Sequence, residues 1–303
     1  MSKKVDKIIS LLESINEKLK MGFPRVRDNN HALFTYSVNS ISGFMVKLRR
    51  VELSIQTQRS ISLLQNAFIR LEQERGVKLL EFSIPEFSNM LNSGIYQMAN
   101  FIAKKYERVK PIIQKVKSSS GNSVIIEFSA EEQELNRTLE SLLNQLRFEL
   151  YIFYEKPSNN RIKIRSEKFI KFMNGDWLEI YTLSKLYKLI GADMVIVKSL
   201  KYQFYGSDYE VDVIVFDSAG NIVLLLENKS STNREIIHKA LEQIESHAKN
   251  LGIDISRCFV IHADELSEEL EHLLKEHTIT LLNFKNMEQP IKDLIKNSME
   301  VEG

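Results

Sequence analysis

Three strand-like runs follow one another in the second half of the sequence, and they constrain the fold more than any other feature. Their β-branched and apolar residues predict strands over residues 194–205, 210–216 and 221–228. Asp217-Ser218-Ala219-Gly220 predicts a hairpin turn between the last two. Further strands are expected at 257–262 and 278–284, and helices at 176–190, 233–249, 265–275 and 287–296. This order predicts a central mixed sheet covered by helices.

The first half carries the apolar spacing of helices. Residues Val5 to Leu19 form a heptad stripe, and spacings of three and four continue over residues 34–71. We expect further helices over 85–113 and 129–153, with one short strand at 124–128. The segment Lys156-Pro157-Ser158-Asn159-Asn160 has the composition of a linker. The sequence therefore predicts a helical, coiled-coil-rich domain over residues 1–155, followed by an α/β domain over residues 161–303.

The net charge of +1 conceals two halves of opposite charge. Residues 1–171 hold 28 Lys and Arg against 18 Asp and Glu, whereas residues 172–303 hold 13 against 22. A basic first half indicates a polyanionic partner such as a nucleic acid. Its basic residues cluster in two groups, Lys104, Lys105, Arg108, Lys110, Lys115 and Lys117, and then Arg161, Lys163, Arg165, Lys168 and Lys171.

Several functional classes are disfavoured by what the sequence lacks. No apolar run approaches the roughly 18 residues needed to span a bilayer, so we expect no membrane association. The single cysteine, Cys258, is consistent with a cytoplasmic protein and excludes an internal disulfide framework. The sequence has no Gly-rich phosphate loop, which argues against an ATP-driven enzyme.

Charged residues interrupt two of the predicted strands where core packing gives no reason for them. Strand alternation places Asp212 on the face of Ile214 and Phe216, and it places Glu227 and Lys229 on the face of Val223 and Leu225. Neighbouring strands of a hairpin are expected to bring Asp212, Glu227 and Lys229 together. Since burying one charge costs several kcal/mol and an exposed ion pair returns only about 0–1 kcal/mol, stability alone does not explain this cluster.

A divalent cation would explain the cluster. Mg²⁺ binds one or two carboxylates and completes its coordination with water and phosphate, so Asp212 and Glu227 are candidate ligands of Mg²⁺ or Mn²⁺. Such an ion polarises a phosphate and activates a bound water. Its charge would also oppose protonation of Lys229, which would then orient or deprotonate that water.

These residues resemble the PD-(D/E)XK, or restriction-endonuclease-like, nuclease superfamily. Asp212 matches the first acid of its motif, and Glu227-Asn228-Lys229 matches the (D/E)XK element. Gly175-Asp176-Trp177-Leu178-Glu179 is similar to the helix that supplies a further carboxylate, with Glu179 as the match. The resemblance implies a restriction-endonuclease-like α/β sandwich. It also implies catalytic roles for Glu179, Asp212, Glu227 and Lys229, a Mg²⁺ or Mn²⁺ cofactor, and hydrolysis of nucleic-acid phosphodiester bonds, in DNA rather than RNA.

The sequence leaves several alternatives open. Asp176 and Glu179 have the spacing of a capping box at a helix start, and Glu210 fits a solvated acid at a strand end. The arrangement is similar to prokaryotic, often archaeal, proteins with a helical front and a nuclease-like domain, and to the nuclease domain of CRISPR-associated ancillary nucleases. An inactive nuclease fold that binds nucleic acid or assembles with a partner is the alternative function. The heptad stripe also favours a homodimer formed through the N-terminal region.

Overall fold

The computed structural model describes residues 33–38, 44–45, 55–85, 91–118, 123–191, 194–231, 233–265 and 279–300, all within the compact unit His31–Gly303. Its strands are β1 (Leu33–Val38), β2 (Phe44–Met45), β3 (Lys78–Pro85), β4 (Ser123–Glu127), β5 (Phe153–Ser158), β6 (Arg161–Arg165), β7 (Val195–Phe204), β8 (Ser207–Phe216), β9 (Ile222–Lys229), β10 (Cys258–His262) and β11 (Thr280–Asn283). Its helices are α2 (Ile55–Arg75), α4 (Gly94–Lys104), α5 (Tyr106–Lys117), α6 (Gln133–Leu146), α7 (Glu167–Lys171), α8 (Trp177–Leu189), α9 (Arg234–Leu251) and α11 (Glu288–Glu300). A π-helical turn, Phe172–Asp176, joins α7 to α8.

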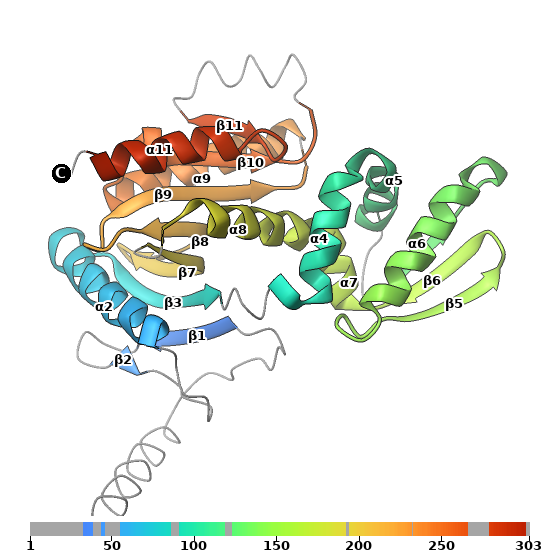
Figure 1. Ribbon diagram of the computed structural model, residues 1–303, viewed down its shortest axis with the longest axis horizontal. Coiled ribbons are helices and arrows are strands. Elements are labelled where there is room, and N and C mark those ends of the chain that lie inside the picture. The colour runs from blue at the N-terminus through green and yellow to red at the C-terminus, as the bar shows by residue number, and fades with distance from the viewer. Residues whose placement is uncertain are drawn as a thin grey trace, which may run out of the picture. The chain divides into compact units, whose positions relative to one another are not determined.

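Eight strands form one mixed sheet in the order β11-β10-β9-β8-β7-β3-β1-β2 (Figure 1). The pairs β9–β10 and β10–β11 are parallel, and the other neighbouring pairs are antiparallel. The predicted turn joins β8 to β9: the Asp217 carboxylate accepts hydrogen bonds from the amides of Ala219 and Asn221, and Gly220 adopts φ = 78°. A second sheet has three antiparallel strands in the order β4-β6-β5.

Helices cover both faces of the large sheet and make two apolar cores. One core joins a face of the sheet to α4, α5, α6, α8 and α11, and it includes the fully buried Trp177. The other joins the opposite face to α2 and α9. The second half of the chain thus has the predicted α/β order and the predicted mixed sheet. Among the described residues, no helix is long and apolar enough to cross a bilayer.

The first half is less helical than the apolar spacing predicts. Two pieces of the stretch expected to be helical, Leu33–Val38 and Phe44–Met45, form β1 and β2, and Ile55–Arg75 forms the helix α2. Leu33–Val38 is rich in aromatic and β-branched residues, and it pairs with β3, so strand pairing overrides the helical spacing. The heptad stripe Val5–Leu19 lies outside the described residues, as do residues 266–275 of the helix expected at 265–275. The expected strand at 124–128 is confirmed as β4.

Two expected helices of the first half differ in the structure. Within the helix expected over 85–113, Leu91 and Asn92 are helical and residues 86–90 lie outside the described residues. This helical stretch breaks at Ser93, which accepts a hydrogen bond from the Tyr96 amide at the start of α4, and again at Lys105. The helix expected to reach residue 153 ends at Leu146, before β5 begins.

Residues 156–160 are not a linker, because they form the end of β5 and the turn into β6. The large sheet also takes strands from both sides of the expected boundary between residues 155 and 161. Antiparallel pairing of β3 with β7 makes this connection, so the strands of the first half extend the sheet of the second.

Candidate functional site: a carboxylate and lysine cluster

The hairpin of β8 and β9 brings Asp212 and Glu227 together. The antiparallel strands pair with Val213 opposite Leu226. Asp212 and Glu227 are the next residues beyond this pair, one on each strand. The Asn228 amide donates a hydrogen bond of 2.7 Å to Oδ2 of Asp212, and the Asp212 amide donates to the Glu227 carboxylate. Each carboxylate is therefore held by the backbone of the other strand.

Strict strand alternation fails at Asp212. Val211 and Ile214 pack in the same core although they are three residues apart, whereas Val213 packs in the opposite core. On β7, Ser199 has φ = 51° and lies between Lys198, which pairs with Val213, and Leu200, which pairs with Val211. The prediction that Asp212 shares a face with Ile214 assumes a regular strand. This irregularity interrupts the alternation on which that prediction rests.

Glu227 and Lys229 share one side of β9, as the alternation predicts, but Val223 and Leu225, expected on that same side, pack in opposite cores. The Lys229 Nζ lies 2.7 Å from Oε1 of Glu227. The other oxygen, Oε2, is buried and has no hydrogen-bond partner in the described part of the chain. Only 2% of the Glu227 side chain is exposed, against 24% of Lys229, so Lys229 is the more accessible member of the pair.

Glu179 reaches the cluster from the first turn of α8. Its Oε2 lies 3.0 Å from Nζ of Lys198 on β7, and both side chains are largely buried. The capping-box interpretation is wrong, because the Asp176 side chain makes no capping hydrogen bond and the chain enters α8 from a π-helical turn. Glu179 thus contacts the charged cluster without closing a cap at the helix start.

The electrostatics show how closely these groups are packed. Burial raises the pKa of Asp212 well above its usual range, and the charges of Glu227 and Glu179 raise it further. Burial also raises the pKa of Glu227. The positive charge of Lys229 lowers this pKa, but the effect of burial is larger. Burial lowers the pKa of Lys229, but the charges of Glu227 and Asp212 outweigh it, so this pKa is raised overall. The charges of Glu179, Glu227 and Lys229 therefore all act on Asp212.

Two residues that sequence reasoning missed belong to the same cluster. Burial lowers the pKa of Lys198, but the neighbouring Glu179 charge, with Asp176 and Asp212, raises it overall. Asp176 has a pKa of about 6 because of burial and the nearby Glu179. One signal was present in the sequence: Lys198 interrupts the apolar run Val195-Ile196-Val197 at a point where only a paired charge is tolerated.

The donor set fits a hard divalent cation with few protein ligands. Two carboxylates lie close together with raised pKa values, and Oε2 of Glu227 has no partner in the described chain. A divalent ion held by Asp212 and Glu227 would stabilise their ionised forms. Within the described residues, no group of three or more His, Cys, Asp or Glu side chains is arranged to hold a metal. A cation held by Asp212 and Glu227 would therefore need water or a bound phosphate to complete its coordination.

A second polar cluster on α5 lies beside the end of β9. Lys117 donates a hydrogen bond of 2.6 Å to the carbonyl of Ser230, the residue after Lys229, and burial lowers the Lys117 pKa. Near it, Asp264 accepts a 2.8 Å hydrogen bond from the Tyr106 hydroxyl and lies 2.7 Å from the Lys110 ammonium. In the sequence these lysines form only a basic run, and in the structure α5 carries them to the sheet.

Several of the predicted basic residues are ion-paired. Arg108 pairs with Glu134 and Lys115 with Glu132. Lys171 lies 3.9 Å from Asp176. These pairs are partly exposed and contribute little to stability, so they do not prevent an exchange of carboxylate for phosphate.

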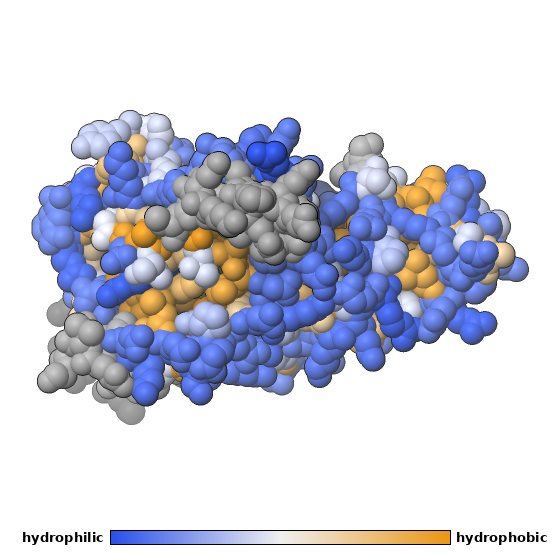
Figure 2. Space-filling model, turned by 90° about the horizontal axis from the view of Figure 1, so that it is seen from above, coloured by the Kyte–Doolittle hydropathy of each residue, from blue (hydrophilic) through white to orange (hydrophobic). Residues whose placement is uncertain are grey.

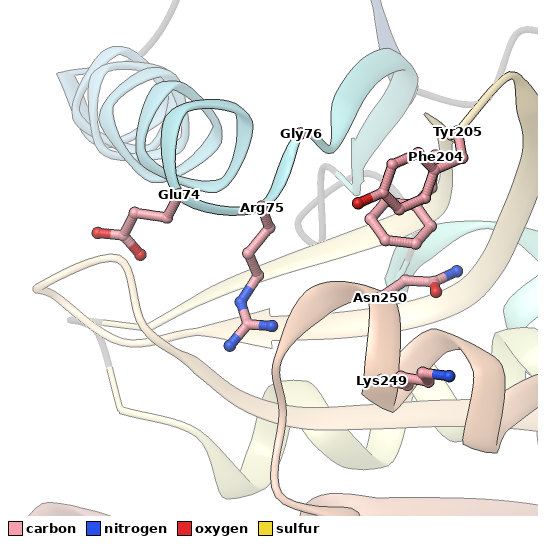
Figure 3. A pocket seen from close by; sticks show the side chains of 7 residues that line it. All are labelled: Glu74, Arg75, Gly76, Phe204, Tyr205, Lys249 and Asn250. Carbon is pink, nitrogen blue, oxygen red and sulfur yellow. The ribbon is translucent and has the colours of Figure 1, made fainter.

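A separate cavity of about 410 Å³ lies away from the predicted residues (Figure 3). The ends of α2, β7 and α9 line it with Glu74, Arg75, Gly76, Phe204, Tyr205, Lys249 and Asn250. Glu74 is its single carboxylate, so this lining does not reproduce the paired acids of the strand cluster. The candidate site is therefore the strand cluster.

Comparison with known proteins shows similarity of fold alone. Neither the protein-family models nor the curated protein sequences gave a match. Can2 from Sulfobacillus thermosulfidooxidans, in complex with cyclic tetra-adenylate, is similar over 80% of this chain with 14% identity and a TM-score of 0.50. VC1899 from Vibrio cholerae is similar over 83% of this chain with 18% identity and a TM-score of 0.40. The chain matches 61% of the Can2 chain and 57% of VC1899.

Proposed function

We propose that this protein is a metal-dependent nuclease that hydrolyses phosphodiester bonds in nucleic acid, with DNA as the expected substrate. The observation that carries the proposal is the convergence of Asp212, Glu227 and Lys229 from two paired strands, beside Glu179 of α8. Can2, whose structure holds cyclic tetra-adenylate, is a protein of similar fold with a nucleotide ligand, and this agrees with the proposal.

Asp212 and Glu227 would hold Mg²⁺ or Mn²⁺ in this proposal. When bound, such an ion polarises the phosphate and supplies an activated water. Lys229 holds a proton beside Glu227 and is the most accessible cation of the cluster, so it is placed to orient water or a phosphate oxygen. Glu179 and Lys198 form a further ion pair near Asp212, and the Asp212 charge interacts with that of Lys198.

Cleavage assays on the full chain test the proposal directly. Single-stranded, double-stranded and branched DNA, and RNA, would be incubated with Mg²⁺ or Mn²⁺ and then with a chelator. We expect metal-dependent products from the wild type, none from Asp212→Ala or Glu227→Ala, and a much lower rate from Lys229→Ala. Glu210→Ala is a matched control, because Glu210 is an exposed acid on the same strand as Asp212.

Two outcomes would contradict the nuclease proposal. Cleavage that persists in both carboxylate variants would show that another site or a contaminant acts. Nucleic-acid binding without products from any substrate would favour the alternative, a nuclease fold that binds or assembles without turnover.

Homodimerisation through the N-terminal region is part of the proposal and rests on the heptad stripe alone. Sedimentation velocity of the full chain and of a variant with Leu12→Asp would test it. Loss of the dimer in the variant would support the assignment, and an unchanged sedimentation coefficient would reject it.

A further inference from the structure

The small sheet exposes one face that core packing does not use. Its central strand, β6, alternates buried Ile162 and Ile164 with outward-facing basic residues. The buried face packs against α6, where Tyr154 of β5 donates a 2.9 Å hydrogen bond to Asn144. On the opposite face Arg161 and Arg165 are exposed and Lys163 is partly exposed, so this face is open in the part of the chain that the structure describes.

Three cations follow one another along this open face. Arg161, Lys163 and Arg165 lie two residues apart, which places successive side chains about 6.8 Å apart along β6. Two carboxylates accompany them: Glu127 lies 3.2 Å from Arg161, and Glu155 lies 3.5 Å from Arg165. All four paired side chains are about half exposed or more, so these ion pairs are weak and open to replacement by phosphate.

Apolar side chains interleave with these cations on the same face. Phe153 of β5 is 69% exposed and lies directly opposite Arg165. Ile125 of β4 is 47% exposed and lies opposite Lys163. Figure 2 shows hydrophobic surface among hydrophilic surface at the end of the molecule that holds α6 and this sheet. Next to the face, the exposed Tyr151 ring carries the Lys168 ammonium 4.4 Å from its centre.

The chain leads from this face straight to the carboxylate cluster. After Arg165, α7 carries Lys168 and Lys171, and the π-helical turn then delivers Asp176 and α8 with Glu179. Lys171 is 74% exposed and lies 3.9 Å from Asp176. Basic side chains therefore continue from the open sheet to the edge of the candidate site.

We propose that the open face of the β4-β6-β5 sheet binds single-stranded nucleic acid, a substrate class that deepens the proposed nuclease function and rests on it. The cations of β6 bind successive phosphates, while Phe153 stacks on an unpaired base. A single strand fits better than a duplex, because the bases of a duplex are already stacked on one another and do not offer their faces to Phe153.

Binding measured without cleavage tests this surface. Fluorescence anisotropy would follow a fluorescein-labelled 20-nucleotide poly(dT) strand, titrated with the full chain in EDTA at low salt. Phe153→Ala should weaken the Kd about tenfold, because base stacking on one aromatic ring has about that effect. Arg165→Ala should weaken binding less and reduce its salt dependence by about one phosphate contact. A duplex of the same length should compete poorly.

Matched controls separate this surface from general charge and from catalysis. Tyr205→Ala removes an aromatic ring that is 90% exposed on the β7–β8 turn, and it should leave the Kd unchanged. Binding is measured in EDTA, where no cleavage is expected, so a failed cleavage assay would not affect this result. An unchanged Kd in both Phe153→Ala and Arg165→Ala would overturn the proposal. So would equal binding of the duplex, or a wild-type dimer that Phe153→Ala converts to monomer.

Discussion

Lys198 and Glu179 form an ion pair of 3.0 Å between β7 and α8, and this contact ties the helix to the carboxylate cluster. The two residues lie 19 positions apart on consecutive elements, and the pair forms because α8 packs on the sheet face that Lys198 occupies. The positive charge of Lys198 also acts on Asp176 and Asp212. Removing Lys198 therefore tests how much this ion pair contributes to the stability of the cluster.

Lys198→Met should destabilise the protein by about 1–3 kcal/mol, because the mostly buried Glu179 loses its counter-charge. Urea unfolding followed by circular dichroism gives this number. Lys201→Met is the control on the same strand, since Lys201 and Glu81 pair at 3.1 Å with about 40% of each side chain exposed. Its effect should stay below about 1 kcal/mol. Equal losses in the two variants would show that burial of the first pair is unimportant.

Asp176 should make the metal-free protein less stable as the pH rises. Its folded pKa of about 6 lies above the unfolded value of about 4, so the folded state holds the extra proton between these pH values. The contribution of Asp176 is fully favourable below about pH 4 and is lost as the pH rises through about 6. Asp176→Asn should therefore gain stability over the wild type between pH 4 and 7. A constant difference across that range would contradict the assignment.

Mg²⁺ should raise the melting temperature of the wild type, because it would relieve the repulsion between Asp212 and Glu227. At 100 times the Kd, one bound ion adds about 2.7 kcal/mol to the free energy of unfolding. Asp212→Asn and Glu227→Gln should lose this shift, whereas Glu210→Gln should keep it. Differential scanning fluorimetry with a chelator control measures the effect. Equal shifts in all four proteins would place the ion elsewhere.

Tyr202→Phe should cost about 1–3 kcal/mol of stability. Its buried hydroxyl lies 2.8 Å from Nδ1 of His247 and accepts from Asn250, so the variant leaves a buried acceptor without its donor. Burial lowers the His247 pKa to about 4, which keeps the ring neutral at pH 7. Tyr205→Phe, at an exposed turn, should change the free energy of unfolding by under about 0.5 kcal/mol. Similar unfolding midpoints for the two variants would reject a structural role for this network.

The sequence determined the order of elements in the second half, since strand-like runs, the Asp217–Gly220 turn and helical spacing are local signals. It also singled out Asp212, Glu227 and Lys229, because charge within an apolar strand stands out without any knowledge of the fold. Tertiary structure decided the rest. β1 and β2 are strands despite helical spacing because β3 offers a pairing edge, and that edge exists only once β3 joins β7. In the same way, Lys198 and Asp176 became part of the cluster through the packing of α8 on the sheet, a tertiary contact that no local pattern encodes.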